Sequence, residues 1–271
     1  MPDHQWTVRG GRDALRAVRP LIDAHARLRT VAVEEVEGFS FVEFHGQGVI
    51  GQVPVDPRLG RFAETAAAVC RRDGATGPVA LLAQWDERAY QGAEAASQLA
   101  PAPLFWPARI ITGRDLPAAL GIGLGACLYF GHGHCGGWDG YWGIDAATVA
   151  QAMVEPAGAV FSLTCMAAKR PPGGFSFCEE LVLSGYCAAA FGSAGRTSHR
   201  RNRRLGLEFC QAMQTHGTVA GVLRNSGASR LSMLGYRIAG DPLASLAGCA
   251  AARARAATIE SGFWRPTESR L

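Results

Sequence analysis

Two apolar runs in this chain end in residues that could act together as a base and a nucleophile. Residues 126–130 lead into Gly131-His132-Gly133, and residues 158–164 lead into Cys165. Each run has the length and apolar composition of a buried strand. If the two strands are parallel neighbours, their carboxyl ends lie at one edge of the sheet, where ligand sites form in open α/β sheets. We therefore predict that His132 and Cys165 face each other as a base and a thiol nucleophile.

The residues around this pair could complete an acyl-transfer site. Attack by a thiolate on a carbonyl produces a tetrahedral oxyanion, which needs donors aimed at it. Because Gly133 has no side chain, a substrate carbonyl can approach its N–H closely, so the N–H groups of Gly133 and Cys165 are the candidate oxyanion hole. His132 would then protonate the leaving amine. Asp139 or Asp145 could orient His132, and the sequence does not choose between them.

The sequence pattern around this pair predicts an α/β fold. From about Pro78 onward, strand-like and helix-like segments alternate, which predicts a mostly parallel sheet with helices on both faces. We expect strands at residues 78–84, 127–130, 158–164, 185–191 and 235–242, and helices at residues 62–72, 90–99, 115–120, 175–184, 205–215 and 219–232. Glu179 and Glu180 are expected on the solvent side of their helix. Residues 101–107 and 192–204 are expected to be loops.

The first part of the chain reads as an extension of this core. Residues 11–28 have helical periodicity, residues 30–36 and 39–44 suggest a hairpin around Glu37-Gly38, and residues 46–55 suggest a further short strand. We predict an N-terminal extension of residues 1–76 packed on a core of residues 77–271, within one continuous domain.

Composition limits the class of protein. The chain is 48% hydrophobic and 18% charged, and its net charge of +4 is too small to argue for nucleic acid or a membrane surface. No signal-peptide core and no apolar run of membrane-spanning length are evident. Eight cysteines in 271 residues lack the density of a secreted disulfide scaffold. We expect a cytoplasmic protein that binds neither nucleic acid nor membrane.

The motifs also resemble a known family. Leu128-Tyr-Phe-Gly-His132-Gly133 with Val160-Phe-Ser-Leu-Thr-Cys165 resembles the His-Gly and Cys motifs of the caspase-like (clan CD) cysteine peptidases, and Tyr236-Arg-Ile-Ala-Gly-Asp241-Pro242 resembles the gingipain branch and CHAT domains. The resemblance covers residues 78–246. It implies a caspase-like three-layer α/β/α sandwich with a mostly parallel central sheet, a His-Cys dyad that hydrolyses peptide bonds, a protein or peptide substrate, and no cofactor. A regulatory protein partner is a further expectation. The caspase Gln-Ala-Cys-x-Gly signature is absent, so specificity for aspartate is not implied.

The same resemblance suggests where substrate binds. In such folds the segment after the strand at residues 185–191 borders the pocket for the residue before the cut, which places Ser193 and Arg196 there. The planar fork of Arg196 suits an acidic side chain. Trp138 beside the histidine loop is a candidate lid, with ordinary packing as the alternative. The basic cluster of Arg196, His199, Arg200, Arg201, Arg203 and Arg204 could also be a solvated surface or a self-cleavage site.

Other interpretations stay open beside a cysteine endopeptidase that forms a thioester acyl-enzyme. His132, His134, Cys135 and Cys165 could together ligate zinc, but they lack a paired Cys-x-x-Cys, so no metal is expected. His45-Gly46 has the same local form as His132-Gly133 without a cysteine-ended strand after it. The dyad could instead act on a non-peptide amide or thioester. The chain could also be a catalytically idle caspase-like module that binds partners.

Overall fold

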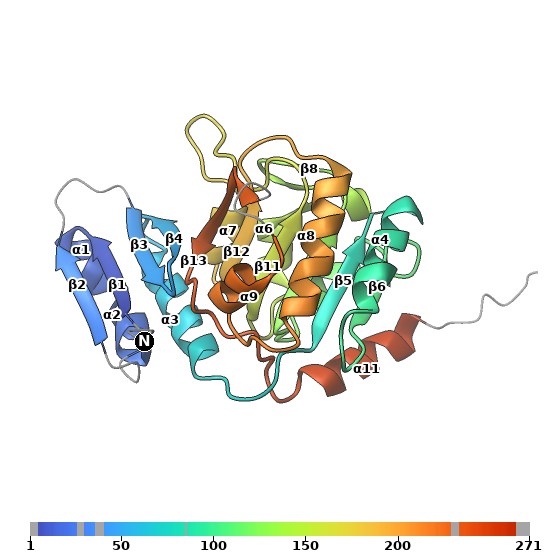
Figure 1. The fold of residues 1–271 in the computed structure, drawn as a ribbon, viewed down its shortest axis with the longest axis horizontal. Helices are drawn as coiled ribbons and strands as arrows, with labels where there is room; N and C mark the ends of the chain where they lie inside the picture. Colours follow the sequence, from blue (N-terminus) through green and yellow to red (C-terminus); the bar gives the residue numbers. More distant parts are fainter. Residues whose placement is uncertain (1–4, 26–29, 36–40, 85, 229–232, 264–271) are drawn as a thin grey trace, which may run out of the picture.

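A single twisted sheet runs through the whole molecule (Figure 1). The computed structural model describes residues 5–25, 30–35, 41–84, 86–228 and 233–263. Ten strands pair in the order β2-β1-β3-β4-β13-β12-β11-β7-β5-β6. Their bounds are β1 (Gln5–Gly10), β2 (Thr30–Glu35), β3 (Phe41–Gly46), β4 (Val49–Pro54), β5 (Val79–Ala83), β6 (Leu104–Pro107), β7 (Ala126–Phe130), β11 (Ala157–Leu163), β12 (Cys187–Ser193) and β13 (Tyr236–Gly240).

The central strands β5, β7, β11 and β12 are parallel to their neighbours within this group and buried along their whole length. They are nearly continuous apolar runs because helices cover both faces of the sheet. One face carries α3 (Leu59–Cys70), α5 (Leu116–Leu120), α6 (Ala146–Gln151) and α7 (Phe177–Leu183), and the other carries α4 (Asp86–Ala96), α8 (His199–Ala212) and α9 (Val219–Asn225). The predicted α/β class with a mostly parallel sheet is confirmed. The carboxyl ends of the four central strands share one edge.

The N-terminal region continues the same sheet, but its predicted hairpin is wrong. Strand β1, which we did not predict, lies between β2 and β3, parallel to the first and antiparallel to the second. The antiparallel hairpin is β3–β4 instead. Its turn residues Gln47 and Gly48 have φ of 51° and 73°, as two-residue hairpin turns require. Glu37-Gly38 lies outside the described residues.

A proline divides the helix expected at residues 11–28. The structure has α1 (Arg12–Ala17) and α2 (Arg19–Ala24), and Pro20 lies in the first turn of α2. Because proline has no N–H to donate, it is tolerated in a first turn and not in a helix interior. Residues 26–28 of the expected helix lie outside the described part of the chain.

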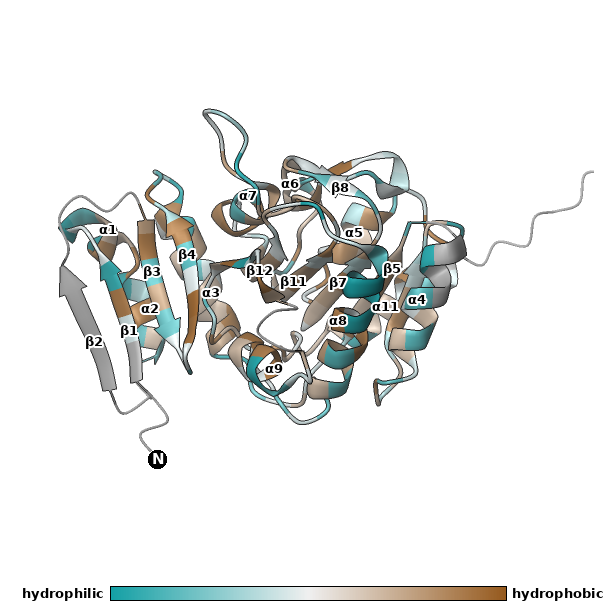
Figure 2. Ribbon diagram, turned by 45° about the horizontal axis from the view of Figure 1, so that its top comes forward, coloured by the Kyte–Doolittle hydropathy of each residue, from teal (hydrophilic) through white to brown (hydrophobic). Residues whose placement is uncertain are grey.

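Both segments expected to be loops contain regular structure. Residues 104–107 form β6 at the edge of the sheet, where a proline removes no ladder bond. Helix α8 begins at His199 instead of 205, because the Ser198 hydroxyl caps it by accepting from the N–H of Arg201. Figure 2 shows the polar residues along α8. The helix expected at residues 219–232 ends at Asn225 as α9, and residues 229–232 are not described. Helix α11 (Ala252–Phe263) was not predicted.

The join between the N-terminal strands and the core is narrow. Strands β4 and β13 are parallel and pair only through Gln52 and Ala239 among the described residues. Cavities open on both faces of the sheet beside these two strands. Within the described ranges, no helix has both the length and the apolar character needed to cross a bilayer.

Candidate active site

The two residues that we predicted as a catalytic pair follow neighbouring parallel strands. Strand β7 pairs with β11 in a register that ends at Phe130 opposite Leu163. His132 and Cys165 each lie two residues beyond this last pair. Because adjacent strands run about 4.8 Å apart, the two backbones leave the sheet side by side at the same edge. The predicted neighbouring arrangement of the two strands is confirmed.

The backbone of His132 is held from both sides, while its side chain is exposed. Its N–H donates to Oε1 of Gln84, the residue that follows β5. Its carbonyl accepts from the Tyr129 hydroxyl at 2.8 Å and from the N–H of Asp139 at 3.1 Å. Sequence reasoning missed Gln84, although a polar residue that ends an apolar strand at this edge is a signal that could have identified it.

Tyr129 ties the histidine loop to the sheet. Its hydroxyl, besides donating to His132, accepts from the N–H of Gly140 at 3.0 Å. Burial raises the pKa of Tyr129, so the hydroxyl stays protonated and remains a donor. The ring stacks on Trp138 at 4.5 Å between centroids. Sequence reasoning missed Tyr129 because it lies inside an apolar run, where the pattern predicts a tyrosine of the hydrophobic core.

Trp138 is part of the core and does not act as a lid. Its side chain is 1% exposed, its Nε1–H donates to the Ser162 hydroxyl at 3.0 Å, and its ring meets Phe177 edge-on. A buried indole that has satisfied its only donor has no face left for a substrate. The expectation that Trp138 binds substrate is therefore corrected, whereas Trp142 nearby is 83% exposed.

Gly133 lies where the chain passes close to the next strand end. It opens the small sheet formed by β8 (Gly133–His134), β9 (Gly137–Trp138) and β10 (Ile144–Asp145). A Cβ at Gly133 would lie 2.8 Å from Oγ1 of Thr164 and 2.9 Å from the carbonyl oxygen of Gly137. Position 133 therefore excludes any side chain without a shift of backbone.

The two carboxylates proposed to orient His132 have other partners. Oδ1 of Asp139 lies 3.5 Å from Nε2 of His134. Asp145 caps α6 by accepting from the N–H of Thr148 at 2.7 Å, and hydrogen bonds from the side chain and then the backbone of Thr148 lower its pKa. Among the described residues, no three His, Cys, Asp or Glu side chains gather in a group that could hold a metal ion.

The Cys165 sulfur is half-buried and faces the segment after β12. The N–H of Thr197 donates to Sγ at 3.3 Å, and the Thr197 hydroxyl lies 3.7 Å from it. That hydroxyl accepts from Nδ2 of Asn202 at 3.0 Å, and Oδ1 of Asn202 accepts from the Tyr236 hydroxyl at 2.6 Å. Met166, the next residue after the cysteine, has φ of 57° and its N–H donates to the carbonyl of Gly195. Backbone and side chains thus fix the sulfur against residues 195–197.

Tyr236 is the fixed end of this chain of hydrogen bonds. Its ring stacks on Phe191 at 5.0 Å, and the Arg201 guanidinium lies over it at 5.0 Å. Burial raises the pKa of Tyr236 to about 12, against the opposing positive charge of Arg201, so the phenol stays a donor at neutral pH. Sequence reasoning identified neither Thr197, Asn202 nor Tyr236 as part of the site, because only the fold brings them together.

The segment predicted to bind substrate lies beside the sulfur. Ser193 is 2% exposed, and its hydroxyl donates to the carbonyl of Gly195 and accepts from the N–H of the same residue. Arg196 is exposed and immediately precedes Thr197, the sulfur's partner. Other members of the basic cluster have partners within the fold: Arg203 pairs with Glu94, and Arg204 with Glu208.

A cavity of about 460 Å³ opens on the α7 face of the sheet near this edge, lined in part by Ala168, Arg170, Glu179 and Tyr236.

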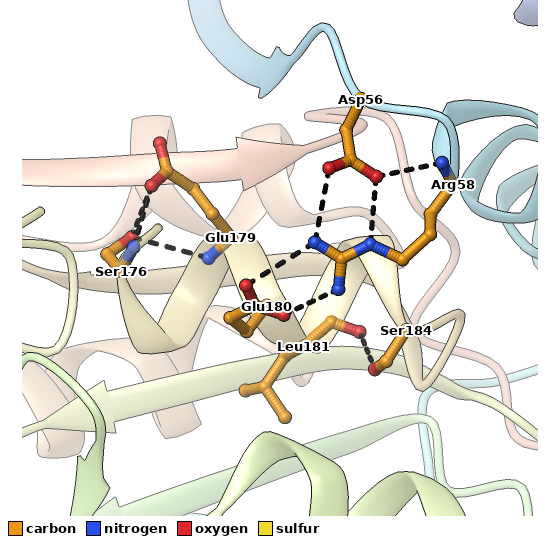
Figure 3. Close-up of polar contacts among 7 residues, drawn as sticks. All are labelled: Asp56, Arg58, Ser176, Glu179, Glu180, Leu181 and Ser184. Atoms are coloured by element: carbon orange, nitrogen blue, oxygen red, sulfur yellow. Dashed lines mark hydrogen bonds and ion pairs between the residues drawn. The ribbon is translucent and has the colours of Figure 1, made fainter. Parts of the chain in front are cut away.

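Glu179 was expected on the solvent side of its helix, and that expectation is wrong. Its carboxylate is mostly buried, completes a capping box with Ser176 (Figure 3), and pairs with Arg170. Glu180 faces outward and pairs with Arg58 at 2.7 Å.

Comparison with known proteins agrees with the fold. The sequence model described as peptidase family C25 matches residues 83–247. The structure is similar to gingipain R, described as an Arg-specific cysteine proteinase, with a TM-score of 0.54 and 15% identity over 69% of this chain and 51% of that one. Against a structure described only as a protease, the TM-score is 0.65 with 10% identity over 90% and 78% of the two chains.

A third similar structure is the complex of the Porphyromonas gingivalis RgpB pro- and mature domains, with a TM-score of 0.55 and 14% identity over 82% of this chain and 59% of that one. This chain thus spans about half the length of gingipain R. No curated protein matches its sequence. The likenesses confirm the predicted three-layer fold with a mostly parallel central sheet.

Proposed function

The chain belongs to peptidase family C25, and from that premise we propose that it is a cysteine-type peptidase that hydrolyses peptide bonds through Cys165 and His132. The observation that carries this proposal is the register of β7 and β11, which brings both residues out of adjacent strands at one edge. The N–H of Thr197 gives the sulfur a donor, as a thiolate nucleophile requires.

The reaction would proceed through a thioester. The Cys165 sulfur attacks the scissile carbonyl carbon, an S–C bond forms, and the carbonyl π electrons move onto oxygen. The protonated His132 ring then gives its proton to the leaving nitrogen as the C–N bond breaks. Water, deprotonated by His132, attacks the resulting thioester and releases the acid and the thiol.

The N–H groups of Gly133 and Cys165 would hold the oxyanion. The hydrogen bond from Asp139 to the His132 carbonyl marks those two residues as a bonded pair of the small antiparallel sheet. Bonded and non-bonded pairs alternate in such a ladder, so the next pair, Gly133 and Trp138, is non-bonded. We infer that the N–H of Gly133 points away from β9, towards the place of a substrate oxygen.

Arg196 would border the pocket for the residue before the cut, and the buried Ser193 would act on this pocket only by holding the backbone. Ser193 fixes the turn at the end of β12, and Arg196 is exposed next to Thr197. A guanidinium there favours an acidic substrate side chain. Gingipain R is described as Arg-specific. We expect a peptide library to show cleavage after acidic residues that Arg196→Ala weakens, and cleavage after arginine would contradict this assignment.

The substrate would be a protein or peptide, with a regulatory protein as a further partner. The similar complex of pro- and mature domains shows that relatives of this fold bind a polypeptide partner. All eight cysteines are free thiols, which supports a reducing, cytoplasmic location.

Covalent labelling with an electrophilic peptide tests the nucleophile. Labelling should disappear in Cys165→Ala and persist in Cys135→Ala, which removes the thiol closest in sequence to the histidine. Labelling that persists in Cys165→Ala would overturn the assignment. Intact dyad chemistry on small thioesters, with no cleavage across a peptide library, would favour a non-peptide substrate.

A further inference from the structure

A second cysteine, histidine and aspartate meet where the N-terminal region joins the core. His25 follows α2, Cys70 is the last residue of α3, and Asp241 follows β13. Nε2 of His25 lies 2.8 Å from Oδ2 of Asp241, and Nδ1 lies 3.4 Å from Sγ of Cys70. His25 is 3% exposed and Asp241 is fully buried. None of these residues belongs to the site at Cys165.

The carboxylate and the imidazole hold each other in place. Oδ1 of Asp241 accepts from the N–H of Leu243 at 2.8 Å, which leaves Oδ2 for His25. Burial lowers the pKa of His25, but the negative charge and the hydrogen bond of Asp241, together with Cys70, raise it more, to about 10 overall. The ring is therefore an imidazolium at neutral pH, and both of its nitrogens donate.

The orientation of this imidazolium determines what Cys70 experiences. Because Nε2–H donates to Asp241, Nδ1–H is directed at the Cys70 sulfur. An imidazole that is oriented by a carboxylate and lies within hydrogen-bond reach of a sulfur is the arrangement that activates a thiol nucleophile. Cys70 is also partly exposed, in contrast to the fully buried Cys127, Cys178 and Cys187. Cys70 thus has an oriented imidazole beside its sulfur and is itself partly exposed.

We propose that Cys70 is a second reactive thiol, a modification site that hydroperoxides and small soft electrophiles attack independently of Cys165. Cys70 is only partly exposed, so its sulfur is a better target for a small reagent than for a peptide backbone. In the peroxide reaction the thiolate attacks one oxygen of ROOH, the S–O bond forms, and the O–O bond breaks. The sulfur loses two electrons and becomes a sulfenic acid, and the leaving alkoxide takes a proton from water.

Modification at this position would affect the join between the two parts of the chain. The three residues come from α2, α3 and the end of β13, so the His25–Asp241 contact links the N-terminal region to the core. An oxygen or an alkyl group on sulfur adds volume next to the imidazole in a closely packed place. We therefore expect the modified protein to unfold at a lower temperature than the free thiol form.

Site-resolved alkylation of the full-length Cys165→Ala protein tests the proposal without depending on its peptidase activity. Iodoacetamide is the probe, and mass spectrometry follows each cysteine with time. Cys135 is the matched comparison, because it is also partly exposed. At pH 7 we expect Cys70 to react at least about tenfold faster than Cys135, and hydrogen peroxide with a sulfenic-acid trap to label Cys70 first.

Two controls separate activation by the fold from intrinsic reactivity. His25→Gln should reduce the Cys70 rate to about that of Cys135 while leaving the Cys135 rate unchanged. In urea, where His25 and Cys70 are no longer held together, the two cysteines should react at the same rate, and this control needs no variant. Equal rates in the native protein, or a fast Cys70 that His25→Gln leaves unchanged, would overturn the proposal.

Discussion

Replacing Tyr129 with phenylalanine would test how the histidine loop is positioned. The substitution removes one oxygen atom and keeps the ring that stacks on Trp138. The lost hydroxyl donates to the His132 carbonyl at 2.8 Å and accepts from the N–H of Gly140 at 3.0 Å. Tyr129→Phe therefore removes two anchors of the loop and preserves the packing beneath it.

The two anchors contribute unequally to stability. The His132 carbonyl keeps the N–H of Asp139 as a donor, whereas Gly140 is buried and its N–H loses its acceptor. A buried polar group without a partner costs about 1–3 kcal/mol, so we expect a loss of that size in the free energy of unfolding. The corresponding fall in Tm is about 2–4 °C for each kcal/mol.

The effect on activity should be larger than the effect on stability. Misplacing a reacting group by about 1 Å can cost about a hundredfold in rate, and Tyr129 directly holds the backbone of His132. We expect kcat on a fluorogenic peptide to fall by about 10- to 100-fold with KM nearly unchanged. Tyr186→Phe is the matched control, since its buried hydroxyl donates to the Leu120 carbonyl at 3.0 Å, away from His132.

Tyr186→Phe should lose stability of a similar order and keep its kcat. If Tyr129→Phe and Tyr186→Phe had equal kcat values, both within about twofold of the parent at a temperature where all three are folded, the hydroxyl of Tyr129 would not position His132.

Three further outcomes follow from the same contacts. Gly133→Ala should lower kcat at least about tenfold, because the new Cβ would meet Thr164 and a backbone carbonyl. The circular dichroism spectrum should stay unchanged. Retained activity would contradict the oxyanion assignment. Tyr236→Phe removes the donor to Asn202 and should slow alkylation of Cys165 about fivefold, which corresponds to the loss of one hydrogen bond. A rate equal to that of the parent would contradict a role of this chain of hydrogen bonds in holding the sulfur. The pKa of His25 rises from 6.5 to about 10 on folding, so its contribution to stability is complete below pH 6.5 and is lost as pH rises towards 10. The difference in urea midpoint between the parent and His25→Gln should shrink over that range, and a constant difference would contradict the ion pair.

The core of the fold could be predicted because buried parallel strands have an unambiguous pattern. Strands β5, β7, β11 and β12 are apolar on both faces, so each is a continuous run in the sequence. The N-terminal pairing could not be predicted in this way. Strand β1 reaches its place between β2 and β3 through contacts distant in sequence, and local alternation in the two flanking strands resembles a hairpin.

The site could be predicted only as far as strand ends determine it. The two apolar runs that end near His132 and Cys165 predict the edge of the sheet at which the site lies. The register confirms that their strands are neighbours. The direction of a side chain could not be predicted in this way: Trp138 points inward to Ser162, whereas Asp139, the next residue, is exposed. Thr197 reaches the sulfur only because β12 lies beside β11 and turns at its end.

The single residue pair between β4 and β13 makes this line the weakest across the sheet. Because one residue pair joins these strands, the four N-terminal strands also depend on α3, α7, the Arg58–Glu180 bridge and the His25–Asp241 contact to stay aligned with the rest. In denaturant or under force, the sheet should therefore separate between β4 and β13 before either half unfolds. This junction is then the boundary between two cooperative units.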